Sequence, residues 1–360
     1  MKKVLIVLFV STLGLTSCRE SFIDVPVDPG TDDPVLSEIL YAKAASDSSW
    51  SVETMNTDRS SMRTLMSLPE NALYLSKPVK NSYLYYNFPL TYSQTSSTRY
   101  LFMATDSTNA RFVSNIRDIA AASLSPDVSK ILYTAHSMYR HELHVINTDG
   151  TGDLLLAKDI EDGFTPAFSP DGKKIAFVTD DRKGGPGKDD DTLSVINIDG
   201  TGRKVIYKDK HGLDRSTLSW SPDGNTILVI GDDKNNRKVL LINADGSGDR
   251  EVVEDRTYKY FGSFAPDGKS IVFLINEPGG ISIAIVPTTG GSYQKIYTGQ
   301  DCEIKYPSFS NDNLKILFIS EDTRITPPDT ERKHEMKLLD ISTKTTHVLS
   351  QNTYIAHPKR

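Results

Sequence analysis

The seven histidines are the side chains that best suit a transition metal, because neutral imidazole is a common metal ligand. His141 and His144 lie three residues apart on an expected strand, so their side chains point to opposite faces and do not readily share a metal. His136, His211 and His334 are expected in loops on one face, where they could converge, with His141 nearby at the edge of its strand. A solvated loop histidine is the commoner situation, and we predict neither a metal nor a cofactor. The full set is His136, His141, His144, His211, His334, His347 and His357.

A hydrolytic nucleophile is not evident in the sequence. The Gly-x-Ser-x-Gly elbow of serine hydrolases does not occur in the chain. Cys302 lies in the acidic segment GQDCEIKY, without a histidine at metal-ligand spacing beside it. Carboxylates gather in KGGPGKDDDT (183–192) and IGDDKNN (230–236), but neither has the alternating pattern of a calcium loop. We therefore expect a plain thiol, solvated turns and no catalytic residue.

Aromatic residues and arginines offer a binding chemistry instead. Tyrosine and tryptophan anchor interfaces or stack on sugars, and guanidinium groups hold carboxylates. Such residues are expected in the loops between second and third strands and between neighbouring repeats, and as a group they form a candidate binding face. The net charge of −6 argues against electrostatic capture of nucleic acid. The candidate residues are Trp50, Arg140, Arg182, Arg215, Tyr258, Tyr260, Tyr306, Arg324 and Arg332.

A repeated turn organises the elements that position these residues. Its copies are variants of Ser-Pro-Asp-Gly, each followed by a short apolar run, and successive copies start 44, 52, 44 and 45 residues apart. In the unit at 164–208, the expected strands TPAF, KIAFVTD, TLSVINI and RKVIYK are separated by turns such as SPDGK and IDGTG. Four antiparallel strands per repeat predict an all-β propeller in which each repeat is one blade. The copies begin at Ser125, Ser169, Ser221, Ala265 and Ser310.

Seven such units are expected. The unit at 39–68 has little room for a first strand, whereas the C-terminal segment NTYIAHPKR resembles one. We therefore expect residues 354–357 to supply that strand, so that pairing between the N- and C-terminal strands closes the ring and removes exposed sheet edges. The alternative is six blades with an additional N-terminal hairpin. The expected second strands start at Ile39, Tyr83, Ile131, Ile175, Ile227, Ile271 and Ile316.

The Phe-Ser-Pro-Asp-Gly-Lys turn, the Ile-Ala-Phe strand and the Asn-x-Asp-Gly hairpin resemble the TolB-type, or WD40-like, Pro-Asp propeller repeat. The resemblance covers roughly residues 37–358 and implies a fold rather than an activity, because the motif residues serve turn chemistry. TolB itself has an additional N-terminal α/β domain, for which residues 19–36 are too short. Related propellers include polyuronide lyases with a histidine-rich metal site, which makes a metal-dependent lyase the alternative function.

The N-terminal residues are expected to direct export. A basic start precedes an apolar stretch at 4–15, which is too short to span a bilayer as a helix. The sequence LTSC resembles the bacterial lipobox, so Cys18 is expected to carry lipid, and Arg19 after it favours the outer membrane. The expected organisation is a signal peptide at 1–17, a flexible acidic tether at 18–36 and the propeller at 37–358.

These features together predict a lipid-anchored propeller at the cell envelope. We expect a monomer, held at the membrane through lipid on Cys18, that binds an envelope protein or a glycan and performs no chemistry of its own. A rigid ring with variable loops suits such a role.

Overall fold

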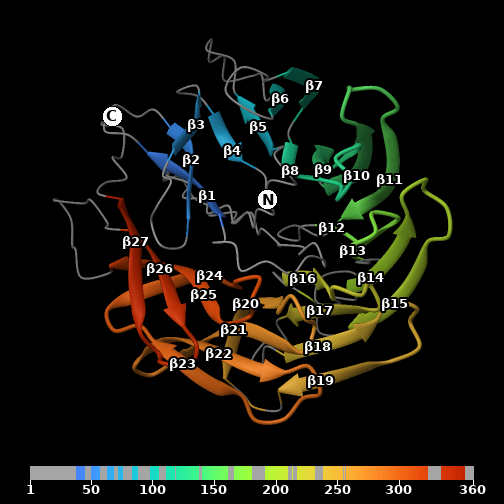
Figure 1. The fold of residues 1–360 in the computed structure, drawn as a ribbon. Coiled ribbons are helices and arrows are strands. Elements are labelled where there is room, and N and C mark those ends of the chain that lie inside the picture. Colours follow the sequence, from blue (N-terminus) through green and yellow to red (C-terminus); the bar gives the residue numbers. More distant parts are fainter. Residues whose placement is uncertain are drawn as a thin grey trace.

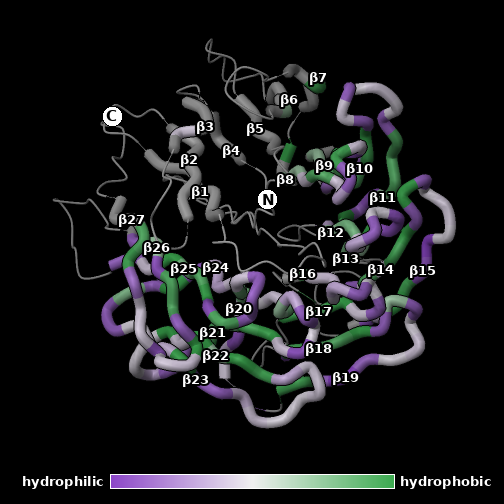
Figure 2. The backbone as a smooth tube through the Cα atoms, viewed as in Figure 1, coloured by the Kyte–Doolittle hydropathy of each residue, from purple (hydrophilic) through white to green (hydrophobic). Residues whose placement is uncertain are grey.

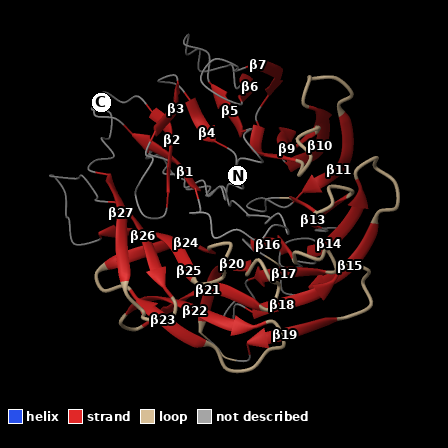
Figure 3. Cartoon of the chain, viewed as in Figure 1, coloured by secondary structure: helices blue, strands red, loops and turns tan. Residues whose placement is uncertain are grey.

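Strands joined by turns make up the part of the chain that the computed structural model describes, and this part contains no helix (Figure 3). It therefore contains no helix that is long and apolar enough to cross a membrane. Figure 1 shows the strands grouped into sheets that follow one another around a common centre, as in a β-propeller. The described residues are 38–44, 50–56, 63–68, 72–75, 83–87, 98–104, 111–117, 119–137, 140–160, 166–180, 191–209, 213, 217–231, 238–253, 255, 257–322 and 334–352.

The first strands of the chain form antiparallel sheets in sequence order. The sheet β1–β2–β3 has three strands, and the sheet β4–β5–β6–β7 has four. Strands β8 to β11 form a further antiparallel meander, which is part of a larger sheet. Their bounds are β1 Glu38–Ala44, β2 Trp50–Asn56, β3 Arg63–Leu68, β4 Ala72–Leu75, β5 Tyr83–Asn87, β6 Thr98–Ala104, β7 Arg111–Arg117, β8 Ile119–Leu124, β9 Lys130–Ser137, β10 Arg140–Asn147 and β11 Leu154–Ile160.

The remaining strands repeat this pattern. A single residue pair, Ile160 with Thr179, joins β11 to β13, so β8–β15 is one eight-stranded sheet made of two meanders. Three further sheets have four strands each. The bounds are β12 Ala167–Phe168, β13 Lys174–Asp180, β14 Asp191–Asn197, β15 Lys204–Asp209, β16 Thr217–Trp220, β17 Thr226–Gly231, β18 Lys238–Asn243, β19 Asp249–Val253, β20 Tyr258–Phe264, β21 Ser270–Glu277, β22 Gly280–Pro287, β23 Gln294–Thr298, β24 Cys302–Phe309, β25 Lys315–Asp322, β26 His334–Asp340 and β27 Thr346–Asn352.

The predicted repeat units agree with these strands. Each expected second strand begins within one residue of its predicted start, at β1, β5, β9, β13, β17, β21 and β25. The first sheet has three described strands, as the sequence of residues 39–68 indicates. Residues 354–357, which were expected to close the ring, lie outside the described residues. The all-β propeller is thus confirmed, whereas seven blades and closure by the terminal strands stay predictions.

The Ser-Pro-Asp-Gly turn joins first and second strands through a local set of hydrogen bonds. In the copy at Ser169, the hydroxyl donates to Asp171 Oδ1 at 2.6 Å and accepts from the Lys174 amide at 2.9 Å. Asp171 Oδ1 also accepts from the Lys173 amide at 3.0 Å. Gly172 has a φ of 70°, a left-handed angle that glycine adopts without a Cβ clash. The motif is turn chemistry, as its residue types predict.

Neighbouring motif turns also pack against one another. A Cβ on Gly172 would lie 3.3 Å from Cδ of Pro126, which belongs to the preceding copy. A Cβ on Gly224 would lie 3.7 Å from Cδ of Pro170, and the next pair of turns has the same relation. The proline of one turn therefore contacts the glycine of the next, which gives both residues a packing role between repeats as well as a turn role.

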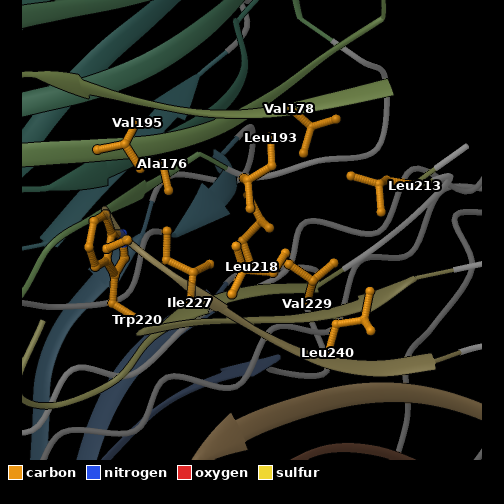
Figure 4. Close-up of a cluster of buried hydrophobic side chains, with 12 residues drawn as sticks. Ala176, Val178, Leu193, Val195, Leu213, Leu218, Trp220, Ile227, Val229 and Leu240 are labelled. Carbon is orange, nitrogen blue, oxygen red and sulfur yellow. The ribbon is translucent and has the colours of Figure 1, made fainter. Parts of the chain in front are cut away.

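The hydrophobic core lies between neighbouring sheets. Strands β17 and β18 present alternate apolar side chains to the clusters on both sides of their sheet, and Figure 2 shows hydrophobic residues along middle strands such as β18 and β22. Trp220 adds a polar tie, because its Nε1 donates to the Ala167 carbonyl at 3.1 Å. Burial of apolar area between sheets is the main stabilising contribution expected for this architecture. One cluster, between β13–β14 and β16–β18, contains Ala176, Val178, Leu193, Val195, Leu213, Leu218, Trp220, Ile227, Val229, Leu240, Ile242 and Ala244 (Figure 4).

Candidate functional site

An aromatic row crosses the inner strands of two neighbouring sheets. The row consists of Tyr258, Tyr260 and Phe261 in β20 and Tyr306 in β24. The centroids of consecutive rings lie 5.8, 5.3 and 5.1 Å apart. These separations are typical of favourable aromatic pairs. The row is therefore one connected feature made by two repeats.

Irregular strands bring the rings together. The register of β20 against β21 shifts between Tyr260 and Gly262, and the register of β24 against β25 shifts between Lys305 and Ser308. At these bulges Phe261 has a φ of 45° and Tyr306 a φ of 54°, a region that bulky residues rarely adopt. The extra residue turns Phe261 so that its ring contacts those of Tyr260 and Tyr306. Backbone strain of this kind occurs where the surrounding structure enforces it, and often at functional sites.

The row extends from solvent into the core. Tyr258 is 44% exposed, whereas Phe261 is 8% exposed and belongs to the core cluster between β20–β23 and β24–β26. Tyr260 and Tyr306 are half-buried and pack against that cluster. Tyr258 starts β20, whose other end leads into a motif turn. The row thus opens on the face opposite the motif turns, where second strands join third strands and one repeat joins the next. We call this the loop-rich face.

A buried lysine within β20 forms hydrogen bonds to the residues just before the row. Lys259 is fully buried, and its Nζ donates to Asp255 Oδ1 at 2.5 Å, to the Thr257 carbonyl at 3.0 Å and to the Asp255 carbonyl at 3.1 Å. Asp255 Oδ1 also accepts from the amide and the hydroxyl of Thr257, at 2.9 and 2.6 Å. We call Asp255, Thr257 and Lys259 the lysine knot. Burial alone would raise the pKa of Asp255, but the hydrogen bonds from Lys259 and Thr257 lower it to about 2.

Charged side chains beside the other end of the row are paired. Lys305, the neighbour of Tyr306, lies 3.2 Å from Glu303 and 3.3 Å from Glu321, both measured from Nζ to a carboxylate oxygen. Glu321 is buried, so its charge requires such a partner. These groups hold the start of β24 against β25. The site as a whole offers aromatic faces, phenol hydroxyls and paired charges, which are the chemistry of binding.

Three of the nine candidate residues meet in this row: Tyr258, Tyr260 and Tyr306. The sequence predicted them in loops, and this placement is wrong. The first strands of these two repeats are seven and eight residues long, since backbone pairing with the second strands continues past the bulges to Tyr258 and Cys302. Their binding role stays a prediction.

The other candidate residues are not placed at this site. Trp50 and Arg140 were also expected in loops, but they open β2 and β10, where they pair with Ala44 and Ser137. The reason at Arg140 is that the connection from β9 is only two residues long, so pairing resumes at once. Four candidates and the lipidation residue lie outside the described residues: Arg182, Arg215, Arg324, Arg332 and Cys18.

Phe261 and Lys259 belong to the site but were not singled out by the sequence. Phe261 fits the apolar pattern of a strand, and only the following glycine, Gly262, hints at a bulge there. Lys259 stands in the strand YKYFGSF, where a lysine at a buried position is a departure from the pattern. That departure was the available signal for the lysine knot.

The histidines are distributed differently from the expectation. His136 and His334 were predicted in loops but lie in β9 and β26, which belong to different sheets, and His211 lies outside the described residues. His141 lies in β10 directly opposite His136. His144 stacks on Tyr133, with ring centroids 5.0 Å apart. Within the described part of the chain, no three histidine, cysteine or acidic side chains are grouped as metal ligands would be.

Comparison with known proteins identifies the family. In sequence, the chain is 30% identical over 144 residues to the protein TolB homolog of Chlorobaculum tepidum, an alignment that covers 40% of this chain and 31% of that protein. The chain thus matches less than a third of the length of this curated relative.

In structure, the chain is similar to the propeller domain of the Trilobed protease from Pyrococcus furiosus, with a TM-score of 0.61, 10% identity, and 87% of this chain and 93% of that one covered. The oligogalacturonate lyase from Vibrio parahaemolyticus also has a TM-score of 0.61, with 13% identity and 88% and 85% covered. At these identities the likeness is one of fold alone. The model of the TolB beta propeller domain matches residues 135–359, and the chain belongs to this family.

Proposed function

We propose that this propeller is a non-catalytic binding module whose loop-rich face binds a protein partner at the aromatic row. The observation that carries the proposal is the unbroken series of ring contacts from exposed Tyr258 through buried Phe261 to half-buried Tyr306. Tyrosine supplies a large contact area with a polar tip and few rotatable bonds, which makes it a frequent anchor of interfaces. A row that is braced by the core presents such anchors in a fixed arrangement.

The geometry of the row favours a protein over a glycan. Consecutive rings are inclined to one another by 51°, 58° and 57°. Rings at these angles do not form the flat platform on which successive sugar rings of a polysaccharide stack. They form an uneven surface with both faces and edges available, which suits insertion of side chains from a partner.

The proposed location is the cell envelope. We propose that lipid on Cys18 anchors a monomer to the outer membrane and that residues 18–36 act as a tether. The acidic tether and the lipobox-like sequence support this location, and membership of the TolB propeller family is consistent with a binding or scaffold role.

A metal-dependent lyase, the alternative function, is not favoured by a specific observation. Such an enzyme requires histidines that converge on one metal, and no such group of ligands occurs among the described residues. The likeness to the Vibrio lyase is of fold.

Cross-linking in intact cells tests the proposal. A photoreactive phenylalanine derivative replaces Tyr258 in the full chain, and the matched control carries it at Leu314, which is 61% exposed in a motif turn on the opposite face. We expect a discrete protein adduct at residue 258 that is absent at residue 314 and survives enzymatic deglycosylation.

Three results would contradict the proposal. An adduct that is lost on deglycosylation would indicate a glycan ligand. Identical adducts at both positions would exclude the aromatic row as the specific site. A stoichiometric transition metal, together with release of unsaturated uronides by the purified chain, would replace the binding function with the lyase.

A further inference from the structure

The lysine knot occupies a position that two other repeats, those that begin with β8 and β24, fill with hydrocarbon. Lys259 lies six residues before the motif start at Ala265, and Ile304 lies six residues before Ser310. Ile119 has the same spacing to its motif at Ser125. Both isoleucines are fully buried, as Lys259 is. The fold itself therefore accepts an apolar side chain at this position, and the ammonium of Lys259 must serve something particular to its own repeat.

Burying a charge here is costly, and the cost is offset only by specific partners. An ammonium that leaves water loses its hydration, and a buried ion pair is often no more stabilising than an apolar residue of similar size. Lys259 has three N–H donors, and the knot supplies a carboxylate oxygen and two carbonyl oxygens to match them. In comparison with isoleucine, this arrangement contributes little net stability, but it strongly restrains the backbone that carries Asp255, Thr257 and Lys259.

The restrained segment is the one that carries the exposed end of the aromatic row. All three acceptors belong to Asp255 and Thr257, which immediately precede Tyr258, and the donor follows it. The side chain of Asp255 also accepts hydrogen bonds from the amide and the hydroxyl of Thr257. The backbone is thus tied on both sides of Tyr258, and the ring of this tyrosine contacts the ring of Tyr260.

We infer that Lys259 is a positioning residue of the binding surface: the lysine knot holds Asp255 and residues 257–259 so that Tyr258 projects from the loop-rich face in contact with Tyr260. The inference rests on the proposed function for its biological meaning, whereas the positioning itself is a property of the protein alone. A ring held in advance loses less conformational entropy when a partner binds. Tyr258 is thereby preorganised without being buried.

The experiment replaces Lys259 with isoleucine, the residue found at this position in β8 and β24. The full chain, purified in detergent with 3-fluorotyrosine at its tyrosines, is compared with Lys259→Ile by ¹⁹F NMR, and the signals of Tyr258 and Tyr260 are assigned by Tyr→Phe exchange. Lys158→Ile is the control, because Lys158 is exposed, lies 3.3 Å from Glu142 in an ion pair, and belongs to a different sheet. Asp255→Leu removes the side-chain acceptor of the same tie with a modest change in volume and serves if Lys259→Ile does not fold.

We expect Lys259→Ile to remain folded while the Tyr258 and Tyr260 signals shift and broaden, with no such change in the control. The cross-link yield at residue 258 is expected to fall, as when a supporting contact of a binding residue is lost. Unchanged tyrosine signals in both knot variants would overturn the inference. Altered signals together with an unchanged cross-link yield would show that the positioning does not serve binding and would overturn that part of the inference. Altered signals in a protein that gives no adduct at residue 258 even with Lys259 in place would overturn the proposed function and leave the positioning intact.

Discussion

Two adjacent glycines in the turn between β21 and β22 have similar backbone angles but different surroundings. Gly279 has a φ of 118° and Gly280 a φ of 124°. A Cβ on Gly279 would meet nothing within 4 Å, whereas a Cβ on Gly280 would lie 2.2 Å from the carbonyl oxygen of Gly299. Gly299 starts the connection to β24, and its amide donates to the Ile281 carbonyl at 2.9 Å. Alanine at these two positions therefore isolates one steric contact close to the loop-rich face.

The expected effects follow from these surroundings. Either alanine must adopt a φ that is essentially restricted to glycine, which costs about 1–3 kcal/mol. Only Gly280→Ala also forces backbone apart, since the obstructing atom is a carbonyl oxygen rather than the end of a flexible side chain, and overpacking of this kind costs about 1–3 kcal/mol more. We expect the free energy of unfolding to fall by about 2–6 kcal/mol for Gly280→Ala and by about 1–3 kcal/mol for Gly279→Ala.

Urea denaturation of the full chain measures this difference. Far-ultraviolet circular dichroism and tyrosine fluorescence are followed together, so that coincident transitions establish two-state behaviour before free energies are compared. Gly280 pairs with Glu277 across the turn, and the Gly299 amide donates to the Ile281 carbonyl. A displaced Gly299 carbonyl should therefore strain the start of β24, which follows it in the chain. Equal destabilisation of the two variants, within about 0.5 kcal/mol, would refute the reasoning.

Three further outcomes are expected. Ala265→Ser should raise the free energy of unfolding by about 0.5–1.5 kcal/mol, and Ser221→Ala should lower it by a similar amount, because the motif hydroxyl donates a hydrogen bond of 2.5 Å to the aspartate of its turn. Urea curves that are unchanged in both variants would contradict this. The pKa of Asp255 is lowered from 3.8 to about 2 in the folded chain, so the carboxylate's stabilising contribution is complete above pH 3.8 and is lost as the pH falls through 2. Asp255→Asn should therefore flatten the dependence of Tm on pH between about 2 and 5. An unaltered slope would argue against the lysine knot. Phe261→Ala should cost about 3–5 kcal/mol and Tyr258→Ala less than about 1 kcal/mol in urea unfolding, and comparable losses would mean that Tyr258 is structural.

Much of the fold could be predicted from the sequence because its signals are local. Pro170, Asp171 and Gly172 set the backbone angles and hydrogen bonds of a turn within a few residues, and the structure contains the expected bonds. The starts of the second strands follow from these turns, as Ile175 and Ile227 show. The local signal also identified most of the strands in the unit at 164–208 to within about two residues.

The candidate site could be predicted only in part. Tyr258, Tyr260 and Tyr306 were selected by residue type, but their positions in strands depend on bulges that leave little trace in the sequence. The contact between Phe261 and Tyr306 joins residues of different repeats. Whether such rings meet depends on the rotation of one sheet against the next, which no short sequence window contains.

The sequence by itself determined the all-β repeat, its turns and the chemistry of the candidate side chains, because proline, glycine and aspartate act on the backbone within their own turn. Only the tertiary structure decided that three of the tyrosines join Phe261 in one row, and that Lys259 is buried against Asp255 and Thr257 just before it. The physical reason is that ring contacts and the burial of a charge are properties of packed sheets. They depend on distances between segments that the sheets bring together, and these distances are set by the packing of the whole core.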